Sequence, residues 1–457
     1  MNPKLGIWRG AGGARTLVAL LLVGGVSQAR GQDRELAPPV AFWKTLGDTT
    51  LERLVGDVVT SNHDVVAARA RLRGARASRT QAALDFAPTV TASASYTRQR
   101  IVSSAFSGGA PAAFPDQNVW DAGLQLSWEL DVFGRIRKTT QGRGALIAAA
   151  DEDVQDLQVL LASELAIAYF DLRGAQDRLQ VARRNAENQQ HTLDVTVQRL
   201  EAGRGNEFDS ERARAQLNST LAGVPELEGS IAAVEHRIAV LVGRPATGLG
   251  QDNTERPVLP ALPDSILVPN SDAAVRLRPD VRGAERRVSA GEAFIGAAKA
   301  AYLPQISIGG GAGYVGNSFD AMGNSNTPRY AIGPVISWPA LNLGRVKAEV
   351  DFARAQEAEA EAYYRKTQLQ ASEEIATSVV TYNKARRSLD YLDAAARASE
   401  RAAALARLRF DEGASDFLQV LDAERTMLEA QDRLAAGRTA ATTGLVALYR
   451  ALGGRLP

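Results

Sequence analysis

Two hydrophobic periods alternate along this chain. From Trp120 to Asp131, apolar residues occupy every second position and polar residues lie between them, which predicts a strand with one apolar and one polar face. The same alternation, weaker in the second half of the chain, predicts four strands of about ten residues, long enough to cross a membrane. They span about 88–100, 118–131, 304–315 and 329–339, and loops rich in glycine, proline, serine and asparagine join them in pairs.

After each pair of strands the pattern becomes helical. Apolar residues recur every seven positions from Leu165 to Leu200, with small alanines between them, which is typical of closely packed coiled-coil helices. A continuous helix over 138–202 would be about 100 Å long. Gly203 interrupts this helix, a second one is expected over about 207–242, and Gly413 interrupts the second half in the same way. Shorter helices are expected before the first strand of each pair, over about 51–84 and 280–301.

One sequence motif occurs twice. Ser127–Lys138 (SWELDVFGRIRK) is similar to Ser337–Lys347 (SWPALNLGRVK), and the tryptophans at 128 and 338 are 210 positions apart. An offset of 210 also aligns residues in the flanking helices, which indicates a tandem duplication of 30–245 and 276–457 with an inter-repeat linker over 246–275. The motif lies where a strand gives way to a helix. We expect its glycine to absorb that change, and we assign the junction to Gly134, Arg135, Gly344 and Arg345.

The N-terminus has the pattern of a secretory signal peptide over 1–29. Basic residues precede an apolar run from Leu17 to Val26, and the cleavage pattern Ser27-Gln28-Ala29 follows it. The run is about half of the ~20 residues that a spanning helix needs, and no other segment approaches that length without charge. The mature chain is therefore expected to be exported, and to use strands wherever it crosses a membrane.

Composition narrows the possible chemistry. The net charge of +1 gives no sign of a nucleic-acid partner, and the absence of cysteine excludes disulfides, thiolate metal sites and cysteine nucleophiles. The three histidines are far apart and form no metal-binding motif. Gly311–Gly316 (GAGYVG) fits a dinucleotide-binding pattern, but a loop rather than a helix follows it. The sequence also has no nucleophile elbow or phosphate loop, and we expect no bound cofactor or metal.

Four strands cannot close a membrane barrel by themselves, because the smallest such barrels have about eight. An open sheet edge in lipid would leave backbone groups unpaired, at several kcal/mol each. The chain is therefore expected to oligomerise, and three copies would supply twelve strands. Helices of about 100 Å are longer than a bilayer is thick, so they are expected in an aqueous compartment. Aromatic residues near the strand ends are expected to mark the membrane interfaces: Trp120, Trp128, Tyr330 and Trp338.

Several stretches together resemble the TolC-like outer membrane factors, and specifically the NodT-type branch that serves resistance-nodulation-division efflux systems. They include WELDVFGR (Trp128–Arg135), RPDVRGAERR (Arg278–Arg287), AYLPQISIGGGAG (Ala301–Gly313) and GASDFLQVLDAER (Gly413–Arg425). The resemblance implies an α+β membrane protein: a homotrimer with a twelve-stranded outer-membrane β-barrel, four strands per chain, continued by a long periplasmic α-helical coiled-coil barrel. It also implies a passive conduit for drugs or other toxic small molecules, and not an enzyme. A periplasmic adaptor and an inner-membrane pump would dock at its helical tips, and outer-membrane lipid would surround its barrel.

The resemblance also places a gate at the periplasmic tip. The family's second tip helix carries a leucine and, four residues on, an aspartate, which here are Leu418 and Asp422. These two share a helix face, so in a trimer they would form rings around the pore. Gln419 stands where some relatives carry another gate acid, and Asp209 matches an aspartate that ties neighbouring helices shut. Phe410 stands where some relatives have a tyrosine whose hydroxyl bonds to that aspartate.

Two further implications concern anchoring and alternative functions. Many members of this branch keep a lipidated cysteine after the signal peptide, whereas this chain has none, so no acyl anchor is expected. The conduit of a type I protein secretion system is the first alternative function, and WELDVFGR favours efflux over it because the branch it marks goes with efflux pumps. A non-conducting periplasmic coiled-coil scaffold is the second, and the amphipathic strands argue against it because a scaffold has no use for an apolar membrane band.

Overall fold

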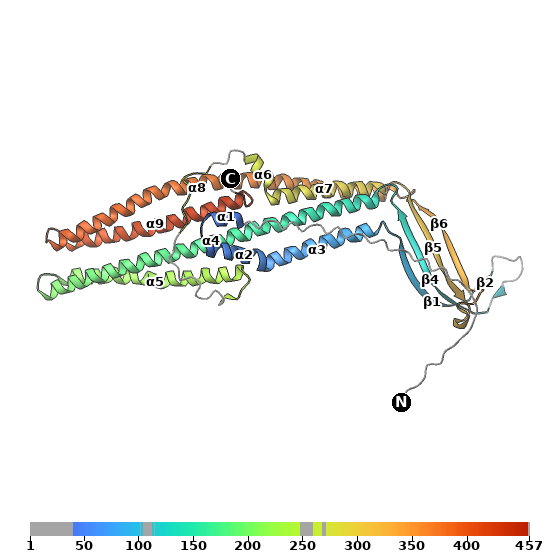
Figure 1. The fold of residues 1–457 in the computed structure, drawn as a ribbon, viewed down its shortest axis with the longest axis horizontal. Helices are drawn as coiled ribbons and strands as arrows, with labels where there is room; N and C mark the ends of the chain where they lie inside the picture. Colours follow the sequence, from blue (N-terminus) through green and yellow to red (C-terminus); the bar gives the residue numbers. More distant parts are fainter. Residues whose placement is uncertain are drawn as a thin grey trace, which may run out of the picture. The chain divides into compact units, whose positions relative to one another are not determined.

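The computed structural model describes residues 40–100, 102–103, 112–113, 115–246, 259–266 and 271–455. Residues 39–457 form one compact unit. The signal peptide expected over 1–29 lies outside the described residues, as does much of the linker expected over 246–275. Long helices and one main sheet are the dominant elements of this unit (Figure 1).

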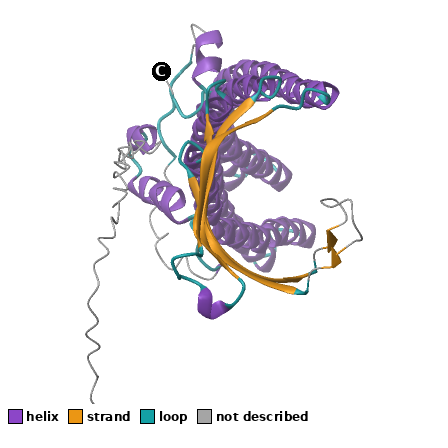
Figure 2. Cartoon of the chain, turned by 90° about the vertical axis from the view of Figure 1, so that its right-hand side faces the viewer, coloured by secondary structure: helices purple, strands orange, loops and turns teal. Residues whose placement is uncertain are grey.

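The main sheet contains four antiparallel strands in the order β1-β4-β5-β6. They are β1 (Thr89–Gln99), β4 (Gln117–Leu130), β5 (Gln305–Gly316) and β6 (Pro328–Ser337). The four strands expected from the sequence are thus present, and the sheet they form is curved (Figure 2). The pairing of β4 with β5 joins strands from the two halves of the chain, while β1 and β6 each keep one edge without a neighbour in this sheet. A short pair that the sequence did not suggest, β2 (Val102–Ser103) and β3 (Ala112–Ala113), forms a separate sheet.

The register of the strands separates two chemically different faces. Trp120 on β4 lies opposite Tyr96 on β1, and one position further Asp121 lies opposite Ser95. Side chains of facing residues project to the same side of an antiparallel sheet, and successive residues project to opposite sides. The even-numbered positions of β4 therefore form an apolar face, and the odd-numbered positions form a polar face.

Two long helical hairpins follow the strand pairs. Gly203 and Gly413 end the first helix of each hairpin with positive φ angles of 67° and 73°, a backbone conformation that favours glycine. The hairpins consist of α4 (Arg135–Glu201) with α5 (Glu207–Leu241), and of α8 (Leu343–Asp411) with α9 (Phe417–Ala451). α4 has 67 residues and α8 has 69, so each is about 100 Å long. Among the described helices, none combines the length and the apolar character that a membrane span requires.

Shorter helices lead into the first strand of each half. They are α1 (Val40–Thr45), α2 (Thr49–Ser61), α3 (His63–Leu84), α6 (Ser271–Leu277) and α7 (Pro279–Ala300). A one-turn 3-10 helix, η2 (Phe319–Ala321), lies between β5 and β6. The single helix expected over 51–84 is interrupted at Asn62. Its side-chain oxygen accepts a hydrogen bond from the N–H of Asp64 and so caps α3, while its amide nitrogen donates to the carbonyl of Leu241.

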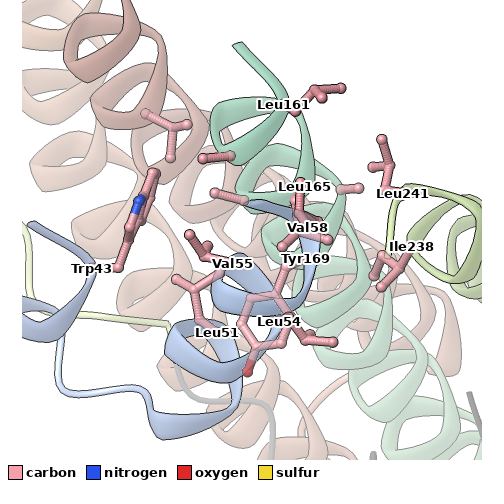
Figure 3. Packing of buried hydrophobic residues seen from close by; sticks show 14 of the residues in the cluster. Trp43, Leu51, Leu54, Val55, Val58, Leu161, Leu165, Tyr169, Ile238 and Leu241 are labelled. Atoms are coloured by element: carbon pink, nitrogen blue, oxygen red, sulfur yellow. The ribbon is translucent and has the colours of Figure 1, made fainter. Parts of the chain in front are cut away.

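The largest hydrophobic cluster lies where α2 packs against α4 and α5. Leu51 and Leu165 are fully buried there, beside Tyr169 (Figure 3). Trp43 of α1 meets Tyr449 of α9 edge to face, with 4.8 Å between the ring centroids, so the cluster also includes the last helix. Burial of each large side chain stabilises the fold by about 1.5–3 kcal/mol. The cluster thus holds the two hairpins together near the middle of α4.

Candidate functional site

The four aromatic residues expected at membrane interfaces lie at opposite ends of the main sheet. Trp120 and Tyr330 lie toward the loops that connect the strands of each pair, and Trp128 and Trp338 lie toward the helices. Tyr330 is 87% exposed. Trp120 is half-buried because its ring packs against two others, Tyr96 at 4.6 Å and Phe319 at 5.4 Å between centroids. This arrangement gives the apolar face an aromatic band at each end, and contact of these bands with lipid stays a prediction.

The first strand-to-helix junction is built as the sequence suggests. Gly134 is the N-cap of α4, with a left-handed φ of 81°. Asp131 accepts hydrogen bonds from the first free N–H groups of the helix, those of Ile136 at 2.8 Å and Arg137 at 3.0 Å. Arg135 forms a two-pronged ion pair with Glu129 of β4, at 2.8 and 2.5 Å. The junction is therefore held from both sides of the glycine.

The second junction differs from the first. Gly344 and Arg345 lie inside the first turn of α8, and Gly344 has no positive φ. The chain instead turns between Trp338 and Asn342, where the N–H of Asn342 donates to the carbonyl of Pro339. The expectation that a glycine absorbs the change from strand to helix is thus correct at Gly134 and wrong at Gly344, because the turn from Pro339 to Asn342 redirects the chain before α8 begins.

Both junctions contain a hydrogen bond that sequence reasoning missed. Trp128 donates its indole N–H to the carbonyl of Phe86, and Trp338 donates its own to the carbonyl of Tyr302. The repeated Ser-Trp motif was the only signal of this bond in the sequence, and it did not identify the acceptor.

The residues assigned to the gate lie at the start of α9. Asp416 caps this helix by accepting the N–H of Gln419 at 3.2 Å. Leu418 is 48% exposed, and Asp422 is exposed and pairs with Arg425 at 3.1 Å. The opposite face of α9 is buried against the rest of the tip through Phe417, Val420, Leu421 and Glu424. The structure thus brings Leu418, Gln419 and Asp422 together on one free face of the helix.

Asp209 lies in the other hairpin, in the first turn of α5. Its N–H donates to the side chain of Asn206, the N-cap of that helix, at 2.8 Å. Asp209 is half-buried, and within the described part of the chain no hydrogen bond or ion pair joins its carboxylate to α8 or α9. A tie between Asp209 and the second hairpin is therefore absent from the described residues of a single chain.

Other polar contacts join the two hairpins near the tip, and sequence reasoning missed them. The guanidinium of Arg199 lies 4.0 Å from the centre of the Phe410 ring, a cation–π contact, and 3.6 Å from the carboxylate of Asp411. Glu424 is 2% exposed, and one of its oxygens accepts hydrogen bonds from Arg407 at 2.7 Å and Thr192 at 3.0 Å.

A sequence signal for these contacts exists on α4. Polar residues at positions 178, 185, 192 and 199 recur every seven residues, so they share one helix face. Arg178 pairs with Asp432 at 2.6 Å, and Asn185 donates to Gln431 at 3.0 Å, while Thr192 and Arg199 make the tip contacts above. The helix therefore carries a polar heptad beside the apolar one, and the apolar heptad alone did not indicate these contacts.

The described residues hold no group of three or more histidine, aspartate or glutamate side chains that could bind a metal ion.

Comparison with known proteins connects these features to a family. The family model for outer membrane efflux proteins matches residues 54–244 and 270–454. The probable outer membrane lipoprotein SilC of Salmonella typhimurium is 26% identical over 430 residues, which cover 92% of this chain and 90% of SilC. Nodulation protein T of Rhizobium leguminosarum bv. trifolii is 28% identical over 396 residues, which cover 87% of this chain and 84% of that protein. The solved structure of the outer-membrane channel OprN matches with a TM-score of 0.83 at 39% identity, over 90% of this chain and 92% of OprN.

These matches confirm the resemblance noted in the sequence. Each of the two matched segments contains two long strands of the main sheet followed by one long helical hairpin. The likeness to OprN extends over nearly the whole described fold, including both the sheet and the helices. The chain belongs to the outer membrane efflux protein family.

Proposed function

We propose that this outer membrane efflux protein forms a homotrimer in which three sheets close a twelve-stranded barrel. The observation that carries the proposal is the sheet itself: among the described residues, β1 and β6 each have one edge without a strand partner, and large apolar side chains such as Leu124 and Ile332 are 53% and 73% exposed. Free backbone groups in lipid cost several kcal/mol each, so a lone sheet would be unstable there. Pairing β1 of one copy with β6 of the next removes every edge.

The helices support the same assembly. Several large apolar side chains of α8 face water in the single chain, among them Phe352 (65% exposed), Leu369 (73%) and Tyr391 (73%). Exposed apolar surface of this extent is typical of a protein–protein interface. We propose that neighbouring copies cover it, so that six long hairpins form a periplasmic α-helical coiled-coil barrel below the sheets.

The assembled trimer would be a passive conduit, not an enzyme. We propose that it carries small molecules, drugs or other toxic compounds, from a periplasmic adaptor and an inner-membrane resistance-nodulation-division pump to the outside. Leu418 and Asp422 of the three copies would close the tip until the adaptor and pump open it. Gln419 would leave that ring less charged than a second acid would, and Asp209 would contact a neighbouring copy rather than its own second hairpin.

The proposal also covers the signal peptide, the tandem duplication and the absence of a lipid anchor. Residues 1–29 would direct export and be removed, and 30–245 and 276–457 would descend from a tandem duplication with 246–275 as the linker. The relative SilC is named a lipoprotein. We propose that the present chain reaches the outer membrane without an acyl anchor, because none of its 457 residues is a cysteine.

The first test is assembly and conductance. The protein purified from outer membranes in detergent should have the mass of three chains by light scattering and should open ion channels in a planar bilayer. A soluble periplasmic monomer would refute the proposal.

The second test concerns cargo. A strain that lacks the gene should become sensitive to antibiotics, detergents or metal ions, and the intact gene should restore resistance. Loss of a secreted protein from the medium, with drug resistance unchanged, would favour type I protein secretion instead.

A further inference from the structure

The polar face of the main sheet carries few charges. Along the four long strands, the only charged side chains at polar-face positions are Asp121, Glu129 and Arg329. The rest of this face consists of threonine, serine, glutamine, valine and alanine side chains and of bare glycine backbone. A hollow of about 290 Å³ lies on this face beside Arg329, and Thr91, Gln125 and Gly311 contribute to its lining.

Both acidic groups on this face are neutralised. Glu129 is held by Arg135 at the helix junction and by the side-chain amide of Gln305 at 2.6 Å. Asp121 accepts a hydrogen bond from Arg329 at 2.5 Å. Arg329 lies on β6 and Asp121 on β4, so the arginine side chain crosses the whole width of β5 to make this contact.

Glycine residues lie beside that crossing. The cross-strand partner of Arg329 is Gly313, whose own partner on β4 is Gly123. A Cβ atom at Gly313 would come within 2.3 Å of the carbonyl oxygen of Ala122, so no side chain fits there. At Gly311 a Cβ atom would lie 3.9 Å from the Arg329 guanidinium. The glycines therefore leave a bare path along which the arginine lies on the sheet.

We propose that the Arg329–Asp121 pair sets the charge selectivity of the barrel lumen, holding it near neutral so that cargo of either charge can pass. This proposal rests on the trimeric barrel proposed above, in which the apolar face meets lipid and the polar face lines the lumen. Threefold symmetry then places three such pairs at one level, close to the loop end of the strands. Removal of one partner would leave three like charges at that level.

The test measures reversal potentials of single channels in a salt gradient. Arg329→Gln leaves three carboxylates unpaired, one in each copy. The ratio of cation to anion permeability should then rise about two- to threefold, which is the effect that a unit charge has on an ion about 7 Å away in water. Asp121→Asn should change the ratio by a similar factor in the opposite direction. The double variant should return to the wild-type ratio.

A matched control exists on the other face of the same sheet. Arg98 of β1 pairs with Asp116 at 3.1 Å but occupies an apolar-face position, and Asp116 keeps a second partner, Arg100, at 2.6 Å. Arg98→Gln should therefore leave the reversal potential unchanged. If the Arg329 variant behaves like this control while its channels still open, the proposal is wrong and the trimeric channel stands.

The lack of native cysteine allows a second measurement on the full-length protein. In Arg329→Cys, a water-soluble thiol reagent that carries an amine should restore the wild-type permeability ratio, and one that carries a sulfonate should shift the ratio further toward cations. Arg98→Cys should show neither response. Modification of Cys at 329 without any change in the ratio would also refute the assignment, whereas absence of channels in the wild type would refute the proposed function itself.

Discussion

Trp128 donates its indole N–H to the backbone carbonyl of Phe86, 2.8 Å away, and so ties the end of one strand to the segment that enters its partner. Phe86 lies just after α3, where the chain turns into β1. The second half of the chain has the same bond, from Trp338 to the carbonyl of Tyr302 just after α7, at 3.0 Å. Each tryptophan therefore fastens the two places where its strand pair meets the helices, in addition to any contact it makes with lipid.

Replacement of these tryptophans by phenylalanine should loosen both junctions. Trp128→Phe and Trp338→Phe keep an aromatic ring but lose the N–H, and each should cost about 1 kcal/mol of stability, the net value of one such bond. The double variant should show the sum, because the two sites lie in different strand pairs and share no partner. The temperature at which the purified assembly unfolds in detergent measures the effect.

Trp120→Phe is the matched control for this experiment. Trp120 lies at the other end of β4, and its indole N–H has no acceptor among the described residues, while its ring contacts are retained in phenylalanine. An equal loss of stability in Trp120→Phe would show that indole size, and not the hydrogen bond, holds the junction.

The free face at the start of α9 gives a prediction for the gate. Asp422→Ala removes a carboxylate ring, so the channel should conduct more or lose cation preference. Gln419→Asp adds an acid beside it and should change the cation preference in the opposite direction. Single-channel recordings in planar bilayers measure both, and unchanged conductance and selectivity in both variants would exclude these residues from the pore.

The ion pair between buried Glu424 and half-buried Arg407 should hold the two helices of the second hairpin together. Arg407→Leu leaves the Glu424 carboxylate buried without its cation and should destabilise the protein by about 3 kcal/mol. Joint replacement of both residues by leucine should cost less than the single change, because no isolated charge remains. Arg425→Leu breaks the exposed pair with Asp422 and should change thermal stability by less than about 1 kcal/mol. If the double leucine variant is less stable than Arg407→Leu, the Glu424 carboxylate stabilises the protein through contacts other than its pairing with Arg407.

The sequence was sufficient for the four long strands and the two long hairpins, but not for the short β2–β3 pair, the break at Asn62 or the contacts between elements. The apolar residues around Trp120 recur every second position, and those from Leu165 recur every seventh. These two periods distinguish strands from helices, so both kinds of element were predictable from a single sequence. The acceptor of Trp128 and the partner of Glu424 depend on how distant segments pack, which no local period encodes. Gly344 shows that a shared motif does not guarantee a shared conformation. It matches Gly134 in the motif, yet it has no positive φ, and a turn containing Pro339 changes the direction of the chain instead.

A half-buried carboxyl on α4, that of Asp156, should make the protein's stability depend on pH. Burial raises the pKa of Asp156 to about 6, and repulsion from Asp280 of α7 adds to the effect. The group has charged neighbours on its own helix and on each helix packed around it: Asp153, Arg278, Glu374 and Arg450. The folded chain thus holds this proton more tightly than the unfolded chain, in which an aspartate has a pKa of about 3.9.

The sign of the dependence follows from that difference. The stabilising contribution of protonated Asp156 is complete below about pH 4, decreases as pH rises toward 6, and is absent above it. Asp156→Asn should flatten this part of the stability profile and raise the stability at pH 7 by on the order of 2 kcal/mol. Unfolding temperatures by circular dichroism between pH 4 and pH 7 measure both. Asp351→Asn, in which an exposed partner of Arg354 on α8 is changed, is the control and should keep the wild-type slope. Parallel profiles for the wild type and Asp156→Asn would mean that this carboxyl is already ionised in the folded protein at pH 4.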